Sequence, residues 1–162
     1  MIQTEQVIQE VKKMIKGKDT SICKVFAAML AGGHILIDDV PGVGKTTLAV
    51  AFSQAMQLEN HRVQFTPDVL PADILGFSMY QKETGQFVYY PGAVICNLFL
   101  ADEINRTSPK TQSALLEVME EGCVTVDGVT REMPEPFLVM ATQNPKGAPV
   151  RSFYRNPSWI DS

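Results

Sequence analysis

The chain has 162 residues and a formal net charge of −4, with 45% hydrophobic and 20% charged residues, which is typical of a globular domain. The scattered lysines argue against a nucleic-acid-binding surface, and no apolar run is long enough for a membrane span. The N-terminus carries Glu5 and Glu10 instead of a signal-peptide pattern, and the three cysteines lack CxxC spacing, so we expect a cytoplasmic protein with buried thiols.

Two amphipathic helices are expected first, within residues 4–31. Gly17 separates them, Asp19 can cap the second, and Gly32-Gly33 ends it. The apolar positions of the first are Val7, Ile8, Val11, Met14 and Ile15, and the expected buried stripe of the second is Ile22, Val25, Phe26, Met29 and Leu30.

Four apolar strands follow, at residues 34–38, 62–66, 97–103 and 136–144. A helix after the first strand presents Leu48, Phe52, Ala55 and Met56 on one side, and Ser108-Pro109 opens another helix that ends near Glu121. Two β-hairpins are expected, one around QKETG (81–85) and one around Asp127-Gly128. Strands alternating with helices predict an α/β fold, a parallel sheet with helices on both faces.

A glycine-rich turn, IDDVPGVGKTT (37–47), lies between the first strand and its helix. Gly42 and Gly44 let backbone N–H groups turn toward a phosphate, and the helix N-terminus adds a positive dipole. Lys45 would reach the β- and γ-phosphates, and the Thr46 hydroxyl would ligate Mg²⁺. The signature GxxxxGK[ST] is incomplete because Asp39 replaces its first glycine, and a purely structural turn is the alternative. The predicted nucleotide-binding residues are Val40, Pro41, Gly42, Val43, Gly44, Lys45, Thr46 and Thr47.

Two acidic residues end the third predicted strand, in LFLADE. Because parallel strands present their carboxyl ends at one edge, we expect Asp102 and Glu103 beside the phosphate-binding loop. Asp102 is suited to hold Mg²⁺ through water, and Glu103 is suited to orient and deprotonate an attacking water. Acids here could simply begin a helix, but their combination with the loop favours chemistry.

The fourth predicted strand ends in polar residues, in LVMATQN. Asn144 is placed to contact the γ-phosphate or the lytic water, although asparagine also suits a simple turn. The predicted catalytic residues are Glu103, Lys45 and Asn144, and the predicted metal ligands are Thr46 and Asp102.

Several long motifs resemble the MoxR family of AAA+ ATPases: DVPGVGKTTLA, FTPDVLPADILG, NLFLADEINRTSPKTQSALLEVMEE, VTVDG and PFLVMATQNP. The resemblance extends from about Gly17 to Pro145 and implies a P-loop NTPase with a three-layer α/β/α sheet in the order 5-1-4-3-2. It also implies ATP and Mg²⁺ as cofactors, a homo-oligomeric hexameric ring, and ATP hydrolysis that remodels or matures a partner protein. It assigns Walker A to Lys45 and Thr46, Walker B to Asp102 and Glu103, and sensor 1 to Asn144.

The same resemblance suggests roles for the two hairpins. Residues 77–90 and 123–131 correspond to inserts that face the central pore and the partner or substrate in such rings, whereas plain connections are the alternative. Asn105 and Arg106 match the family's DEINR motif. They are expected either to touch a neighbouring subunit or to form a polar loop.

The tail after Gly147 departs from the family pattern, which continues with a segment resembling GSAGTQLLPESQLDRFM, a fifth strand and a helical lid. A one-base shift of suitable codons for residues 152–161 encodes QLLPESQLDR, so we expect a frameshift at or near codon 147; a natural short variant is the alternative. Residues 1–147 would then be a partial AAA+ core, with N-terminal helices at 4–31 and a nucleotide-binding unit at 34–147, and residues 148–162 an aberrant tail. A chain truncated in this way would lack the arginine finger and lid and would bind nucleotide but hydrolyse it poorly.

Two other functions stay open on the sequence alone. The chain could be a regulatory module that binds nucleotide without hydrolysis, which Glu103 disfavours. It could also be a P-loop kinase, but it has no signature of an acceptor pocket.

Overall fold

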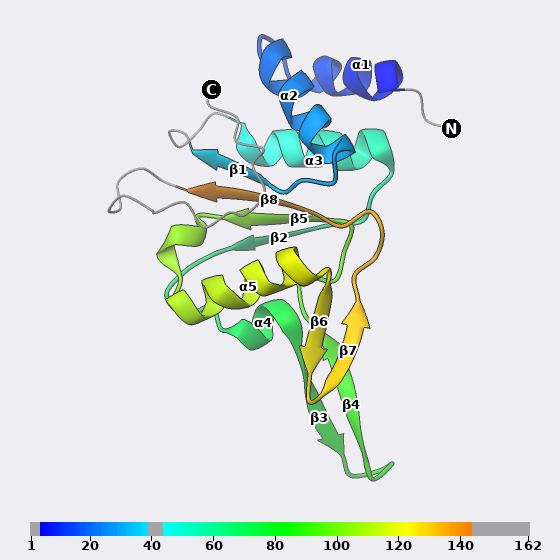
Figure 1. Cartoon of the computed structure of the whole chain (residues 1–162), viewed down its shortest axis with the longest axis vertical. Coiled ribbons are helices and arrows are strands. Elements are labelled where there is room, and N and C mark those ends of the chain that lie inside the picture. The colour runs from blue at the N-terminus through cyan, green and yellow to red at the C-terminus, as the bar shows by residue number, and fades with distance from the viewer. Residues whose placement is uncertain (1–3, 39–43, 144–162) are drawn as a thin grey trace.

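A four-stranded parallel sheet forms the centre of the computed structural model, which describes residues 4–38 and 44–143 (Figure 1). Its strands, in spatial order, are β1 (Ile35–Asp38), β8 (Leu138–Gln143), β5 (Leu98–Asp102) and β2 (Asn60–Gln64). All three neighbouring pairs are parallel. The parallel α/β sheet predicted from the sequence is confirmed, and this order matches the 1-4-3-2 part of the expected sheet.

Helices cover both faces of the sheet, as Figure 1 shows. On one face lie α1 (Thr4–Met14), α2 (Asp19–Leu30) and α3 (Lys45–Met56), and on the other lie α4 (Pro71–Leu75) and α5 (Pro109–Glu121). A short 3₁₀ helix, η1 (Ile104–Arg106), follows β5. Two antiparallel hairpins extend from the second face: β3 (Gly76–Gln81) with β4 (Gln86–Pro91), and β6 (Cys123–Val126) with β7 (Val129–Glu132).

Each central strand buries side chains on both of its faces. In β5, Leu98 and Leu100 pack in the cluster that contains α1, α2 and α3, while Phe99 and Ala101 pack in the cluster that contains α5. Successive side chains of a strand point to opposite faces, so a strand covered on both sides reads as a continuous apolar run. This is why β5 and β8 were recognisable in the sequence.

Helix α5 begins and ends where its sequence signals predict. The Ser108 hydroxyl accepts a hydrogen bond from the backbone N–H of Thr111 at 3.2 Å, and Pro109 occupies the first turn. Gly122 ends the helix with φ of 66°, a left-handed conformation that glycine adopts without the cost that a Cβ brings.

The structure corrects several local predictions. Met14, expected on the apolar face of the first helix, and Leu30, expected on the buried stripe of the second, are 46% and 61% exposed, and each is the last residue of its helix. Cys23, expected to be buried, is exposed. Strand β2 is shifted two residues toward the N-terminus, since its pairing with β5 places Asn60 opposite Leu98.

Helix α4 was not predicted from the sequence. It is short, and its start is stabilised by Asp73, whose carboxylate accepts a hydrogen bond from the backbone N–H of Leu70 at 2.8 Å. None of the helices within residues 4–38 and 44–143 is long and apolar enough to cross a membrane.

Candidate functional site

The last residues of all four central strands are polar and lie at the same edge of the sheet. Register pairs Asp38 with Gln143 and Gln64 with Asp102. In open parallel sheets, ligands bind outside this carboxyl edge. The predicted acids therefore lie at the edge where α/β proteins place their chemistry.

The N-terminus of α3 follows β1 in the chain and offers backbone donors. Gly44 precedes the helix with φ of 78° and ψ of 24°, a left-handed conformation that would cost another residue about 1 kcal/mol or more. Its carbonyl accepts the N–H of Leu48 at 2.9 Å, which begins the helical hydrogen bonding. The N–H groups of the first turn have no partner within a helix, and with the helix dipole they favour an anion.

Several predicted site residues fall wholly or partly outside the described structure. Residues 40–43 and Asn144 lie outside it, and so does the tail at 148–162. Lys45 is described as the first residue of α3. Thr46 and Thr47 lie in the same first turn.

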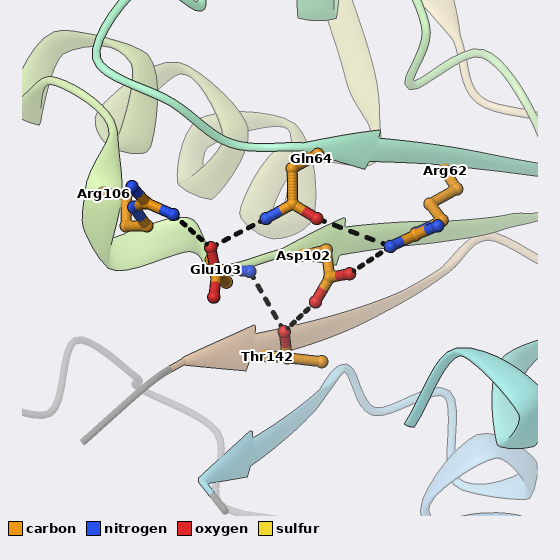
Figure 2. Close-up of polar contacts among 6 residues, drawn as sticks. All are labelled: Arg62, Gln64, Asp102, Glu103, Arg106 and Thr142. Carbon is orange, nitrogen blue, oxygen red and sulfur yellow. Dashed lines mark hydrogen bonds and ion pairs between the residues drawn. The ribbon is translucent and has the colours of Figure 1, made fainter. Parts of the chain in front are cut away.

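Asp102 lies between two hydrogen-bond donors from the neighbouring strands, as Figure 2 shows. Its Oδ1 accepts a hydrogen bond from the Thr142 hydroxyl of β8, and its Oδ2 accepts one from Nη2 of Arg62 on β2 at 2.7 Å. The Asp102 side chain is 15% exposed, whereas that of Arg62 is 50% exposed. The carboxylate is thus held from both sides of β5.

Thr142 connects the two acids. Its side chain is buried, with 2% of the residue exposed. The hydroxyl donates to Asp102 and accepts the backbone N–H of Glu103 at 3.0 Å. One buried hydroxyl therefore orients the carboxylate of Asp102 and the backbone of Glu103 together.

Glu103 adopts a left-handed backbone conformation, with φ of 55° and ψ of 47°, immediately before η1. Such a conformation costs a residue other than glycine on the order of 1–3 kcal/mol and often marks a functional position. The Glu103 Oε2 accepts hydrogen bonds from Nε2 of Gln64 and from Nη1 of Arg106, both at 2.8 Å (Figure 2). The side chain of the predicted base is thus oriented by two donors of its own chain.

Sequence reasoning missed three of these contacts. These contacts involve Arg62 and Gln64 on β2 and Thr142 on β8, and the only available signal was that all three are polar residues at or near the end of a strand. Arg106 was expected at a neighbouring subunit or in a polar loop. It forms an ion pair with Glu103 of its own chain.

The donor set fits a magnesium–nucleotide complex. Mg²⁺ prefers hard oxygen ligands and is commonly held by one or two carboxylates together with phosphate oxygens. Asp102 offers a carboxylate at the carboxyl edge, and Thr46 offers a hydroxyl in the first turn of α3. The α3 N-terminus offers N–H groups to phosphate.

Comparison with known proteins gives consistent matches over most of the chain. Residues 34–153 match the family described as "ATPase family associated with various cellular activities (AAA)". The chain is 52% identical over 140 residues to the uncharacterized protein YeaC of Bacillus subtilis, and the match covers 86% of this chain. It is 47% identical over 141 residues to the chaperone MoxR1 of Mycobacterium tuberculosis, with 87% of this chain covered.

A solved structure shows the same fold. The crystal structure of a candidate ATPase from Cytophaga hutchinsonii superposes with a TM-score of 0.78 and 43% identity over 90% of this chain. The chain spans 44% of the length of YeaC, 37% of MoxR1 and 44% of the Cytophaga protein. The matches therefore describe less than half of each relative.

Proposed function

Because the chain belongs to the ATPase family associated with various cellular activities (AAA) and is related to the MoxR proteins, we propose that it binds ATP with Mg²⁺ and hydrolyses it. The observation that carries the proposal is the arrangement of Asp102 and Glu103 around the Thr142 hydroxyl, at the carboxyl edge of a parallel sheet. A pair of acids held in this way suits a division of labour between cation binding and proton transfer.

The binding residues divide by chemistry. The first turn of α3 donates N–H groups to phosphate oxygens, and Lys45 adds a positive charge. Thr46 and Asp102 would hold Mg²⁺, which neutralises phosphate charge when bound. We further propose that Asn144 and residues 40–43 line the same nucleotide.

Glu103 acts as the general base. Its Oε2 is occupied by Gln64 and Arg106, so the carboxylate accepts the proton of the attacking water through Oε1. The left-handed backbone and the hydrogen bond from Glu103 N–H to Thr142 set where this oxygen points. The attacking oxygen then gains nucleophilic character as its proton moves to the carboxylate.

The proposal is tested by single-turnover hydrolysis, which detects slow enzymes. Glu103→Gln should keep ATP affinity within about threefold but lower the hydrolysis rate by about 10²-fold or more, as loss of a general base does. Lys45→Ala should lose ATP affinity. Glu117→Gln, which removes an exposed acid of α5, is the matched control and should behave as the parent chain.

Three outcomes separate the candidates. A parent chain that does not bind ATP would overturn the proposal, and so would unchanged hydrolysis in Glu103→Gln. Binding without any single-turnover hydrolysis in the parent chain would favour the regulatory nucleotide-binding module.

Beyond this site we propose that a full-length member of the family assembles into a homo-oligomeric hexameric ring in the cytoplasm and remodels a client protein. The remodelling of a client is supported by the name of the relative MoxR1, a chaperone, and the ring is what the resemblance to the MoxR family implies. The cysteines Cys23, Cys96 and Cys123 are free, which suits a reducing compartment. Light scattering of a full-length family member with and without ATP would measure the assembly, and a monomer under both conditions would contradict the ring.

A further inference from the structure

We propose that Arg62 is a positioning residue that forms an ion pair with Asp102 and offsets its negative charge. Magnesium binding at Asp102 then depends on bound nucleotide. This inference rests on the proposed function, because it concerns the same carboxylate. Arg62 lies on β2, outside the sequence motifs that predicted the site.

The contact between Arg62 and Asp102 differs from the ion pairs on the surface. Lys13 and Glu10, for example, are 68% and 57% exposed, and such pairs contribute little because water screens them. Asp102 is only 15% exposed, and the Nη2–Oδ2 distance of 2.7 Å is that of a charge-assisted hydrogen bond. Arg62 therefore neutralises a carboxylate that water reaches poorly.

The charge of Arg62 opposes a cation at this carboxylate. Thr142 donates to Oδ1 of Asp102 and Arg62 donates to Oδ2. A magnesium-bound water would donate to the same carboxylate. The guanidinium, however, repels a second cation, so Mg²⁺ alone binds weakly and the phosphates of ATP must supply the missing negative charge.

Arg62 is also able to withdraw. Its side chain is half exposed, so its charge can return to water without the penalty of an unpaired buried cation. It donates a longer hydrogen bond of 3.4 Å to Oε1 of Gln64, whose Nε2 donates to Glu103. Movement of Arg62 away from Asp102 would therefore change the contacts of both acids. Asp102 would lose a hydrogen bond, and Glu103 would be affected through Gln64.

The experiment measures the Mg²⁺ concentration that half-saturates the binding of a fluorescent ATP analogue to the purified chain. Arg62→Gln removes the charge, Arg62→Lys keeps it, and Arg131→Gln removes an equal charge from the β6–β7 hairpin, where Arg131 lies over the Tyr89 ring. We expect Arg62→Gln to lower the half-saturating Mg²⁺ concentration by about tenfold, since a nearby repulsive charge is lost. Arg62→Lys keeps the repulsive charge and should stay within about threefold of the parent chain, and Arg131→Gln should match the parent.

A purely structural role for Arg62 predicts the opposite sign, because a loosened Asp102 would need more Mg²⁺. An unchanged or increased half-saturating concentration in Arg62→Gln would therefore overturn the inference. If Arg62→Gln does not fold, Arg62→Met provides a second neutral variant that keeps the apolar stem and is judged by the same criterion. Failure of the parent chain to bind the analogue at any Mg²⁺ concentration would instead overturn the proposed function.

Discussion

The four-stranded sheet and the β3–β4 hairpin bury their side chains in opposite ways. In β5 every residue from Leu98 to Ala101 is buried, and only Asp102 at the end of the strand is partly exposed. In the hairpin four large apolar side chains are exposed, with Phe77 at 49%, Met79 at 50%, Tyr80 at 52% and Phe87 at 74%. The sheet is therefore stabilised by burial against other elements, whereas much of the hairpin surface stays in contact with solvent.

The sheet is covered by helices on both faces, so long-range packing sets the position of each strand. The polar edge that carries Asp102 and Glu103 belongs to this packed sheet, so its strands are held in position from both faces. Apart from Arg131 of the β6–β7 hairpin, which lies over the Tyr89 ring, the hairpin depends largely on contacts between its own strands, with the Phe77 and Tyr90 rings stacked at 5.6 Å and the Tyr80 and Phe87 rings 5.4 Å apart. A site that must orient two carboxylates is thus built on the element whose geometry is most strongly constrained.

The largest effect is expected in the sheet. Phe99 is fully buried and its ring meets Phe65 edge to face at 6.5 Å, so Phe99→Ala leaves a cavity in the α5-side core. We expect a loss of about 3–5 kcal/mol in the free energy of unfolding. Urea denaturation measures it, and a loss below about 1 kcal/mol would contradict the assignment of this cluster as core.

A smaller loss of unfolding free energy is expected when the buried hydroxyl of Thr142, which contacts both acids of the site, is removed. Thr142→Val keeps the shape of the side chain but removes the donor to Asp102 and the acceptor of the Glu103 N–H. We expect a loss of about 1–3 kcal/mol in unfolding free energy, because a partly buried N–H is left unpaired. Thr125→Val is the control, since its hydroxyl lies on an exposed hairpin and pairs with Thr130. Equal effects in the two variants would contradict the proposed role of Thr142.

The sheet was predictable because its evidence is local. Continuous apolar runs indicate strands buried on both faces, and Ser108-Pro109 with Gly122 marks both ends of α5. The relationship to the MoxR proteins, expected from the motifs, is confirmed by the match to MoxR1. The acids at the end of β5 could also be found, since a hydrophobic strand ended in Asp102 and Glu103.

The contacts of those acids could not be predicted, because they depend on which strands become neighbours. Arg62 meets Asp102 only because β2 pairs with β5 in a register that places Gln64 opposite Asp102. Thr142 reaches the same carboxylate because β8 lies on the other side of β5. Leu30 was predicted to be buried but is exposed. Periodicity alone does not show which residue of the last helical turn faces the sheet and which faces solvent.

Acid should weaken the sheet through His34. Its Nδ1 accepts the N–H of Val139 at 3.0 Å, and its Nε2 then donates to the carbonyl of Met119 at 3.0 Å, so the neutral ring joins β8 to α5. Burial lowers the pKa of His34 below its ordinary value of 6.5. The unfolded chain therefore binds a proton more readily, and stability present above about pH 6.5 is lost as the pH falls toward the native pKa.

The test compares the urea midpoints of the parent chain and His34→Gln at pH 7.5 and pH 5.5. We expect the parent to lose stability between these values and the variant to show a smaller loss over the same interval, because it lacks the titrating ring. An identical pH dependence in both proteins would show that other groups cause it. Cys96 does not titrate in this window, since burial raises the pKa of its thiol to about 11.

The smallest effect is expected at the hairpin, where Phe87→Ala removes an exposed ring that contacts Tyr80 across the strands. We expect a loss of about 0.2–1 kcal/mol in unfolding free energy, the usual contribution of one cross-strand pair. Phe77→Ala is the matched variant, because its partner Tyr90 lies on the opposite face of the same hairpin. The two losses should add in the double variant to within about 0.5 kcal/mol, since the pairs share no contact. A loss above about 2 kcal/mol for Phe87→Ala would mean that the hairpin packs as part of the core, and the contrast between the two regions would be wrong.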